Sequence, residues 1–406
     1  MLSPQFRKLD FFKTINYLAI VYAFILPLSR GGIGVITALL VLLWFLEGNF
    51  KQKLTLYINT KVVVALLVFL VFNIFSLLWT EDIQGAVHTM RRYAYLLPVF
   101  VLMFSLKKEY IFKILSAFIL GMFISEVISY GVFFELWQFK HATPANPSPF
   151  MHHIEYSIFL AFTALVLMGR IFNEDNLRHK LFYSFFFMTV SGNLFLTAGR
   201  TGQLAFILGL FVLAVLSFKN KVKALVIAIV LSTLVLSIAF NLSTTFHDRI
   251  ITGKDSLVNV VKKENYCTSW GSRVGAWIIS KDIIVQDPIL GIGNADNMKE
   301  FHHLIDTKYP SMVCMHKAFY HAHNQYFQIW TALGLVGLLI FLSIFYIMLK
   351  MQIKDKELKN IKYVYLTLLA FGFVSEVLLQ RQFSLALFAL IFGILLAQYR
   401  IENESN

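Results

Sequence analysis

About twelve apolar segments with charged residues clustered at their ends constrain this chain more than any other feature of its sequence. The 406 residues are 58% hydrophobic and only 15% charged, and the mean hydropathy is +0.67. Soluble domains carry about a quarter charged residues, and a membrane-spanning helix needs about twenty mostly apolar residues. We therefore expect an all-α polytopic membrane protein in which residues 1–406 form a single integral membrane domain.

The apolar stretches predict where the spans lie. The first stretch, Thr14 to Leu28, has no small-residue cleavage site and is interpreted as a span rather than a signal peptide. A long hydrophilic segment, residues 241–323, separates the ninth span from the tenth. The expected spans lie near residues 14–29, 32–47, 62–79, 93–106, 110–134, 153–170, 181–197, 201–218, 222–240, 324–349, 363–380 and 383–399.

The distribution of lysine and arginine predicts the orientation. One set of connections carries 21 of these residues, and the short connections of the other set carry 6. Basic residues concentrate in cytoplasmic loops, so we expect cytoplasmic termini in a bacterial inner membrane. The 241–323 loop would then be periplasmic and carry part of an active site. Because the cations cluster at segment ends, the net charge of +13 does not indicate a nucleic-acid partner.

Several cations lie on the side of the membrane that normally disfavours them. A contact with a lipid headgroup or a local ion pair explains any one of these residues. As a set they suggest an anionic ligand held at the outer leaflet. They are Arg30, Arg91, Arg92, Arg200 and Arg381, accompanied by His323.

The long loop has a helical stretch after a polar start. Residues 246–263 are polar and are expected to be irregular. Ser272 is a candidate cap for a helix that continues to Val285, in which Arg273 and Trp277 share a face. The alternative is an ordinary surface helix with a snorkelling arginine.

Both cysteines of the chain, Cys267 and Cys314, fall in the same loop. Disulfides persist in the periplasm, so we expect a bridge, with two free thiols as the alternative.

His323 lies where the loop re-enters the membrane. An imidazole that titrates near neutral pH suits a general base or an orienting donor, although an interfacial histidine with a structural hydrogen bond is the alternative. No strong zinc spacing is present, and we expect no metal and no cofactor. The weak candidates are Cys314-x-His316, His321-x-His323 and His152-His153-x-Glu155.

A tight turn surrounds Arg200. Gly199 and Gly202 free the backbone beside it, and an arginine in such a turn can grip a phosphate with two parallel hydrogen bonds. The alternative is a capped helix end with an exposed cation.

Short motifs near these residues resemble one known family. His323-Asn324, followed after nine residues by Gly334 and after two more by Gly337, resembles the pattern of the O-antigen ligase and O-antigen polymerase superfamily. Taken alone, the two glycines indicate close helix packing. Other stretches similar to that family are 199–202 around Arg200, 272–277 with Arg273 and Trp277, 288–293, and 149–157.

The resemblance implies a fold of the type-C glycosyltransferase kind and a metal-independent, inverting transfer. The donor would be a polysaccharide on undecaprenyl diphosphate, and the acceptor a sugar hydroxyl of lipid A–core, in lipopolysaccharide biosynthesis. His323 would activate the acceptor, while Arg200 and Arg273 would bind the donor diphosphate. Candidate substrate-binding residues are Arg30, Arg91, Arg92, Arg381, Asn324 and Trp277.

Three alternatives stay open. An O-antigen polymerase joins lipid-linked repeat units with the same residues. Protein O-oligosaccharyltransferases of this superfamily are usually longer, which counts against that branch. A transporter of polyprenyl-linked glycans would use intramembrane acids, for which Glu126 and Glu376 are the candidates.

Overall fold

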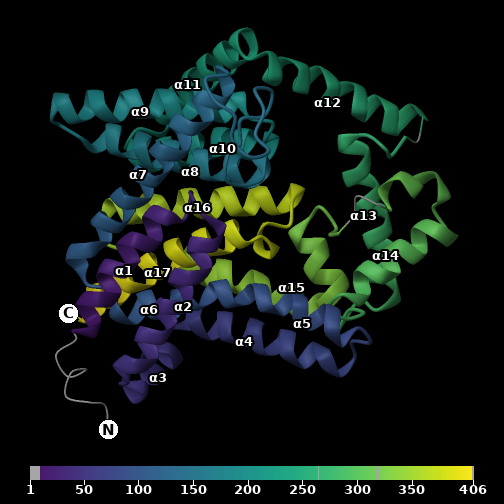
Figure 1. Cartoon of the computed structure of the whole chain (residues 1–406), viewed down its shortest axis with the longest axis horizontal. Coiled ribbons are helices and arrows are strands. Elements are labelled where there is room, and N and C mark those ends of the chain that lie inside the picture. The colour runs from purple at the N-terminus through teal and green to yellow at the C-terminus, as the bar shows by residue number, and fades with distance from the viewer. Residues whose placement is uncertain (1–9, 264, 317–319, 405–406) are drawn as a thin grey trace.

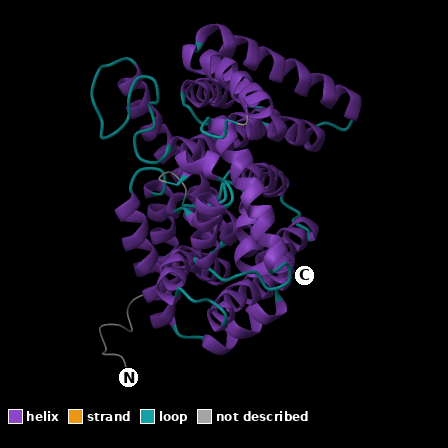
Figure 2. Ribbon diagram, turned by 90° about the vertical axis from the view of Figure 1, so that its right-hand side faces the viewer, coloured by secondary structure: helices purple, strands orange, loops and turns teal. Residues whose placement is uncertain are grey.

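The protein is almost entirely helical, as the sequence predicts. The computed structural model describes residues 10–263, 265–316 and 320–404, and those residues contain no β-strand (Figure 2). The α-helices are α1 (Phe11–Ile25), α2 (Arg30–Glu47), α3 (Phe50–Asn59), α4 (Lys61–Phe75), α5 (Ile83–Arg91), α6 (Leu97–Ser105), α7 (Lys108–Phe133), α8 (His153–Asn173), α9 (Leu177–Leu196), α10 (Arg200–Ser217), α11 (Lys221–Leu242), α12 (Thr244–Lys263), α13 (Ser269–Gln286), α14 (Asp296–Thr307), α15 (Gln325–Lys350), α16 (Lys356–Ser375) and α17 (Gln382–Glu404). Short 3-10 helices are η2 (Ser76–Leu78), η3 (Arg92–Leu96), η4 (Pro310–Met315) and η5 (Leu378–Gln380).

A helix occupies each of the twelve expected spans. Within the described residues, eight helical stretches are long and apolar enough to cross a membrane: α2, α4 with η2, α7, α8, α10, α11, α15 and α17. The chain is therefore a multi-pass membrane protein. The span expected at 93–106 is built in two parts, because η3 precedes α6 and Pro98 occupies the first turn of α6, where proline is tolerated.

Two helices form the buried centre. The apolar windows of α8 and α17 are each 83% buried inside the protein. α17 packs on α6 and α8 packs on α9 and α10, and Figure 1 shows α16 and α17 between the α7–α11 group and the α2–α6 group. Because protein rather than lipid surrounds these helices, polar groups near their ends can be held by protein contacts.

A helical layer lies beside the membrane helices, on the right of Figure 1, and consists of α12, α13, α14 and η4. The expectation of an irregular stretch at 246–263 is wrong, because α12 covers it. The Ser243 hydroxyl accepts the Phe246 N–H at 3.1 Å, and the buried Phe246 ring packs on Phe195 with centroids 5.1 Å apart. The polar composition of this segment led to the wrong prediction, because a helix at the surface needs only one apolar face.

The helix α13 begins earlier than expected. Thr268, not Ser272, caps it, because the Thr268 hydroxyl accepts the Gly271 N–H at 3.1 Å. A disulfide joins Cys267, next to this cap, to Cys314 in η4. The cysteines are therefore bridged, as the sequence led us to expect.

α15 is broken at Gly334, where φ is +65° and ψ is −171°. The loop after α13 satisfies the exposed backbone groups: the Leu335 N–H donates to Pro288 O at 2.9 Å, and the Ile292 N–H donates to Thr331 O at 3.0 Å. A Cβ at Gly334 would lie 2.1 Å from the Ile289 carbonyl oxygen. This glycine therefore permits a left-handed backbone and a close approach, which differs from the helix–helix packing inferred from the sequence.

Candidate active site

The turn before α15 holds His323. Its φ is +48°, in the left-handed region that few non-glycine residues adopt. The next residue, Asn324, caps α15: its Oδ1 accepts the N–H groups of Tyr326 and Phe327 at 2.9 and 3.1 Å. The Asn324 Nδ2 donates to the Val374 carbonyl at 3.1 Å. Asn324 therefore ties the start of α15 to the end of α16 and holds His323 at that junction.

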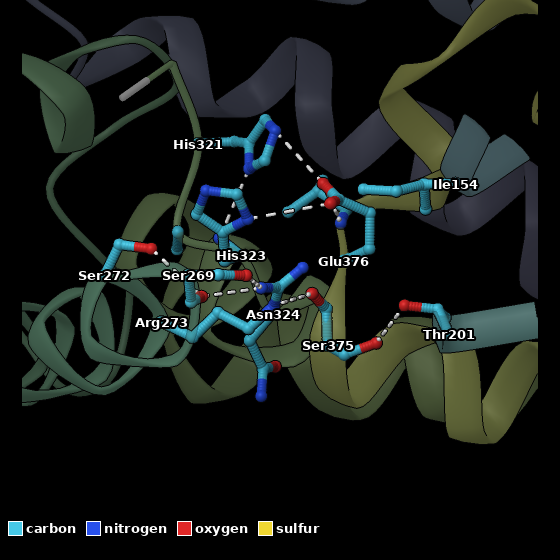
Figure 3. Close-up of polar contacts among 12 residues, drawn as sticks. Ile154, Thr201, Ser269, Ser272, Arg273, His321, His323, Asn324, Ser375 and Glu376 are labelled. Atoms are coloured by element: carbon cyan, nitrogen blue, oxygen red, sulfur yellow. Dashed lines mark hydrogen bonds and ion pairs between the residues drawn. The ribbon is translucent and has the colours of Figure 1, made fainter. Parts of the chain in front are cut away.

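Glu376 is the centre of the cluster shown in Figure 3. It directly follows α16 and is fully buried. Its Oε1 lies 3.1 Å from His321 Nε2 and 3.4 Å from Arg381 Nη2, and its Oε2 lies 3.6 Å from His323 Nδ1. Burial acts to raise the pKa of Glu376, but these three neighbours together lower that pKa far below its usual range. Glu376 is therefore a carboxylate.

His321 supports this carboxylate as a neutral ring. Burial lowers the pKa of His321 to about 4, although the Glu376 charge acts in the opposite direction. The His321 Nδ1 accepts the backbone N–H of His323 at 3.3 Å, so the ring proton lies on Nε2, which faces Glu376. The nearby Arg381 guanidinium and the His321 Nε2–H are both hydrogen-bond donors. Arg381 therefore binds the Glu376 carboxylate rather than the His321 ring.

Four of the five arginines predicted at the external face line one cleft of about 930 Å³, and Arg200 does not. Arg381 is held between two carboxylates, because its Nη1 is 4.0 Å from Glu155 Oε2 in addition to its contact with Glu376. We call this region the arginine cleft; its basic residues are Arg30, Arg91, Arg92, Lys140 and Arg381, and His321 and Glu155 also line it.

Protein acceptors already hold two more of the cleft arginines. The Arg30 Nε donates to Gln382 Oε1 at 3.0 Å, and the Arg92 Nη1 donates to the Gln380 carbonyl at 3.2 Å. The positive charge of the cleft is therefore fixed in position and partly balanced by protein groups.

Arg273 lies on the other side of Glu376. Its Nε donates to the Ser375 carbonyl at 3.2 Å and its Nη1 to the Ser269 carbonyl at 2.8 Å. Burial lowers the pKa of Arg273, an effect that the Glu376 charge opposes. The Ser375 hydroxyl also lies 2.9 Å from the Thr201 hydroxyl, which joins the first turn of α10 to the same point.

Arg200, the first residue of α10, forms no ion pair among the described residues. Its Nη1 is buried and has no hydrogen-bond partner among the described residues. The like charges of Arg249 and Arg273 act on it. We call Arg200, Arg249 and Arg273 the α10–α13 arginines. A buried unpaired guanidinium donor beside two other cations favours an anionic ligand.

Trp277 lies one turn after Arg273 on α13. Its ring packs edge-on against Phe327, with centroids 6.3 Å apart, and its buried Nε1 has no hydrogen-bond partner among the described residues. Beside it is an almost entirely apolar cavity of about 420 Å³. Its lining is Val274, Trp277, Ile278, Lys281, Ile284, Val285, Phe327 and Trp330.

One described cluster has the composition of a metal site. The ligand atoms of His321, His323 and Glu376 all lie within 4.8 Å of one another. Arg381, however, lies 3.4 Å from Glu376 Oε1 and 3.5 Å from His321 Nε2, so a metal cation would meet a like charge there. Cys314 is engaged in the disulfide. The geometry therefore favours a carboxylate–arginine pair at this position.

Sequence reasoning did not assign Glu376, His321 or Glu155 to the transfer site. The sequence indicates Glu376 only as a candidate acid of a transporter. A useful signal was available, because Arg381 follows Glu376 by five residues at the same predicted membrane face. An acid and a cation at one helix end indicate a shared site more strongly than either does alone.

Comparison with known proteins finds a family that is similar to part of this chain. A family model described as O-antigen ligase matches residues 185–342, which include Arg200, Arg273 and His323. Over this segment the chain is similar to the O-antigen ligase family. The resemblance inferred from the short motifs is thereby confirmed. Arg30, Arg91, Arg92, Glu376 and Arg381 lie outside the matched O-antigen ligase segment.

A curated relative gives a more limited comparison. An uncharacterized protein of Haemophilus influenzae is 27% identical over 230 residues, which cover 53% of this chain and 56% of the relative. The chain thus spans about half the length of the relative it matches.

Proposed function

We propose that this protein transfers a glycan from a polyprenyl diphosphate to a sugar hydroxyl. One observation carries the proposal: the Glu376 carboxylate, which backs His323, contacts Arg381 of the arginine cleft and acts electrostatically on Arg273 of the α10–α13 arginines. Two cationic regions linked to one histidine by this carboxylate suit two anionic substrates that meet at a base. The preferred donor is an undecaprenyl diphosphate-linked polysaccharide and the preferred acceptor is lipid A–core.

In this mechanism His323 removes the proton of the acceptor hydroxyl. Glu376 faces His323 Nδ1, so it holds the ring and stabilises the imidazolium that forms. We assign His323 Nε2 as the nitrogen that accepts the proton of the hydroxyl. The acceptor oxygen forms a bond to the anomeric carbon as the bond from that carbon to the diphosphate oxygen breaks. A direct displacement of this kind inverts the anomeric configuration.

The departing diphosphate gains negative charge, which cations must stabilise. We assign this role to Arg200 and Arg273, because fixed donors aimed at developing charge are effective in a site that excludes water. Arginines that supply this charge make a metal ion unnecessary. Protein stripped with a chelator should therefore still catalyse transfer, and activity that returned only with a divalent ion would contradict the assignment.

The apolar part of the donor has a place beside these arginines. The cavity next to Trp277 lies on the same face of α13, directly after Arg273. We place the first isoprene units there. Trp277 then contributes to donor binding through apolar contact, while Asn324 contributes by holding His323 at the junction of α15 and α16.

The arginine cleft is assigned to the acceptor. Its volume of about 930 Å³ and its mixed charges suit a phosphorylated glycan with both acidic and hydroxyl groups. Arg30, Arg91, Arg92 and Arg381 would bind the phosphates, and the attacking hydroxyl would lie toward His323. The site would face the periplasm, and both termini would be cytoplasmic.

The proposal is tested by complementation. His323→Ala and Arg200→Ala, expressed at wild-type level in a ligase-null strain, should fail to restore polymer-decorated lipopolysaccharide on a gel. Full restoration by either variant would remove that residue from the mechanism.

The same experiment distinguishes ligase from polymerase. A ligase mutant leaves the core bare and accumulates lipid-linked polymer, whereas a polymerase mutant still adds one repeat unit to the core. Uptake of labelled substrate into proteoliposomes without a covalent product would instead favour a transporter.

A further inference from the structure

A second cavity lies away from the glycan-transfer residues, between α7 and α9. It measures about 280 Å³. Its rim includes exposed hydrophobic side chains, Phe134, Leu136 and Phe185 among them, so in a membrane it opens toward lipid. Its lining is Phe123, Glu126, Val127, Tyr130, Gly131, Phe134, Leu136, Trp137, Phe185 and Thr189.

One acidic side chain belongs to this mostly apolar lining. Glu126 is only 2% exposed, and neither of its carboxyl oxygens has a hydrogen-bond partner among the described residues. The neighbouring Thr189 hydroxyl already donates its proton to the Phe186 carbonyl at 3.1 Å. A charged carboxyl group that is buried without a counter-ion is strongly unfavourable until a partner reaches it. Such a group inside a membrane protein indicates a ligand.

Aromatic rings are fixed around this acid. The Tyr130 hydroxyl donates to the Thr189 carbonyl at 2.7 Å, and the Trp137 Nε1 donates to the Ile128 carbonyl at 3.2 Å. The Trp137 ring folds back onto Gly131, where a Cβ would lie 1.9 Å from a ring carbon. Gly131 thus lets the indole approach α7 closely and complete the wall of the cavity.

A carboxylate among aromatic faces is the chemistry that recognises an organic ammonium group. Ring faces attract cations. A primary ammonium also supplies three N–H donors, which the carboxyl oxygens of Glu126 can accept. We propose that this cavity binds the ammonium headgroup of phosphatidylethanolamine. A trimethylated headgroup has the charge but no N–H donors, and a glycerol headgroup has donors but no positive charge.

The depth of the acid in the membrane agrees with a lipid headgroup. α7 has 26 residues and is therefore about 39 Å long, which exceeds a hydrocarbon core of about 30 Å. Glu126 precedes the Phe133 end of α7 by seven residues, or about 10 Å. If α7 is centred in the bilayer, Glu126 lies about 6 Å below the boundary of the hydrocarbon core, within reach of a headgroup drawn inward by the acid.

The test measures lipid retention by the intact protein. Wild-type protein is purified in mild detergent with equal amounts of phosphatidylethanolamine, phosphatidylcholine and phosphatidylglycerol. Native mass spectra should show that it retains phosphatidylethanolamine in preference to the other two lipids. Glu126→Gln removes the charge but keeps the size, and retention should fall at least about tenfold. Trp137→Leu should lower retention about threefold or more, from the loss of a cation–π contact.

A matched tryptophan outside the cavity serves as the control. Trp79 packs on Phe72, with ring centroids 5.9 Å apart, and does not line the α7–α9 cavity. Trp79→Leu should retain phosphatidylethanolamine at the wild-type level. Equal retention of all three lipids by the wild type, or unchanged retention in Glu126→Gln, would overturn the proposal. If Glu126→Gln folds poorly, the lipid preference of the wild type and the retention of phosphatidylethanolamine by Trp137→Leu test the proposal instead.

Discussion

The arginine cleft and the α10–α13 arginines present the same charged group in opposite electrostatic settings. In the cleft, Arg381 lies between the Glu376 and Glu155 carboxylates. In the other region, Arg200 has no carboxylate within ion-pair distance among the described residues, and the like charges of Arg249 and Arg273 act on it. The difference shows that the partners of a cation, more than the number of cations, decide how strongly a site attracts an anion.

This comparison supports different roles for the two regions. Unbalanced, buried charge suits a group that becomes more negative during the reaction, such as a leaving diphosphate. Balanced charge at the wall of a larger cleft suits recognition of a substrate whose charge does not change. Substitutions should therefore affect the rate at the α10–α13 arginines and mainly the affinity in the cleft.

The largest effect is expected at Arg200. Arg200→Ala should lower kcat/KM for the lipid-linked donor by about 100- to 1,000-fold, the range seen when a donor to a developing oxyanion is removed. Arg200→Lys should recover part of this, because it restores a charge without the two-pronged geometry. Arg178→Ala, at an exposed position on α9, should behave like wild type. A loss of less than about threefold in Arg200→Ala would contradict the comparison.

Glu376→Gln should have the next largest effect. The amide keeps the shape but no longer holds His323 as a charged partner, so kcat should fall about 10- to 100-fold. The same change removes one of the two carboxylates beside Arg381. Inhibition by added pyrophosphate should become stronger, because the cleft then carries unbalanced charge. Unchanged pyrophosphate inhibition would show that the balance of charge does not control anion affinity there.

Arg91→Gln tests the cleft with a smaller effect. Arg91 is exposed and lines the cleft, so its loss should raise the acceptor KM about five- to tenfold, the equivalent of one typical hydrogen bond. The donor KM should not change, which provides an internal control. A parallel rise in the donor KM would mean that both substrates use the cleft.

The smallest effect concerns stability. Because burial lowers the pKa of His321 to about 4, the unfolded chain binds a proton more readily than the folded chain below the ordinary histidine pKa of about 6.5. Folded-state stability should therefore fall as the pH drops from about 6.5 toward 4. His321→Asn should show a weaker drop in Tm over this range by intrinsic fluorescence. An identical pH dependence in both proteins would remove His321 as its source.

The positions of the membrane helices were predictable because a membrane imposes a length and a composition. Long apolar runs bounded by cations give spans within a few residues of the observed helices. The helix at 244–263 was missed because its sequence is mostly polar and its apolar contacts, such as Phe246 on Phe195, come from a distant part of the chain. Composition reports the average hydrophobicity of a helix, whereas its packing depends on the apolar residues of one face.

The candidate site was only half predictable for a related reason. His323, Arg200 and Arg273 belong to short motifs that are visible locally. Glu376 follows His323 by more than fifty residues, and no local pattern indicates that the two side chains meet. Gly334 shows the same limit of local sequence. Glycine suits both close helix packing and a helix break, and only the contact with the loop after α13 shows that this one is a break.

The break in α15 has a mechanical consequence. The loop that ends α13 is hydrogen-bonded to α15 on both sides of Gly334, through Thr331 and Leu335. Arg273 lies at one end of this joined unit, and His323 precedes the other. Under the proposed function, a tilt of α13 toward an arriving diphosphate would pull on the segment that carries His323, so that donor capture and alignment of the proton acceptor would occur as one movement rather than two.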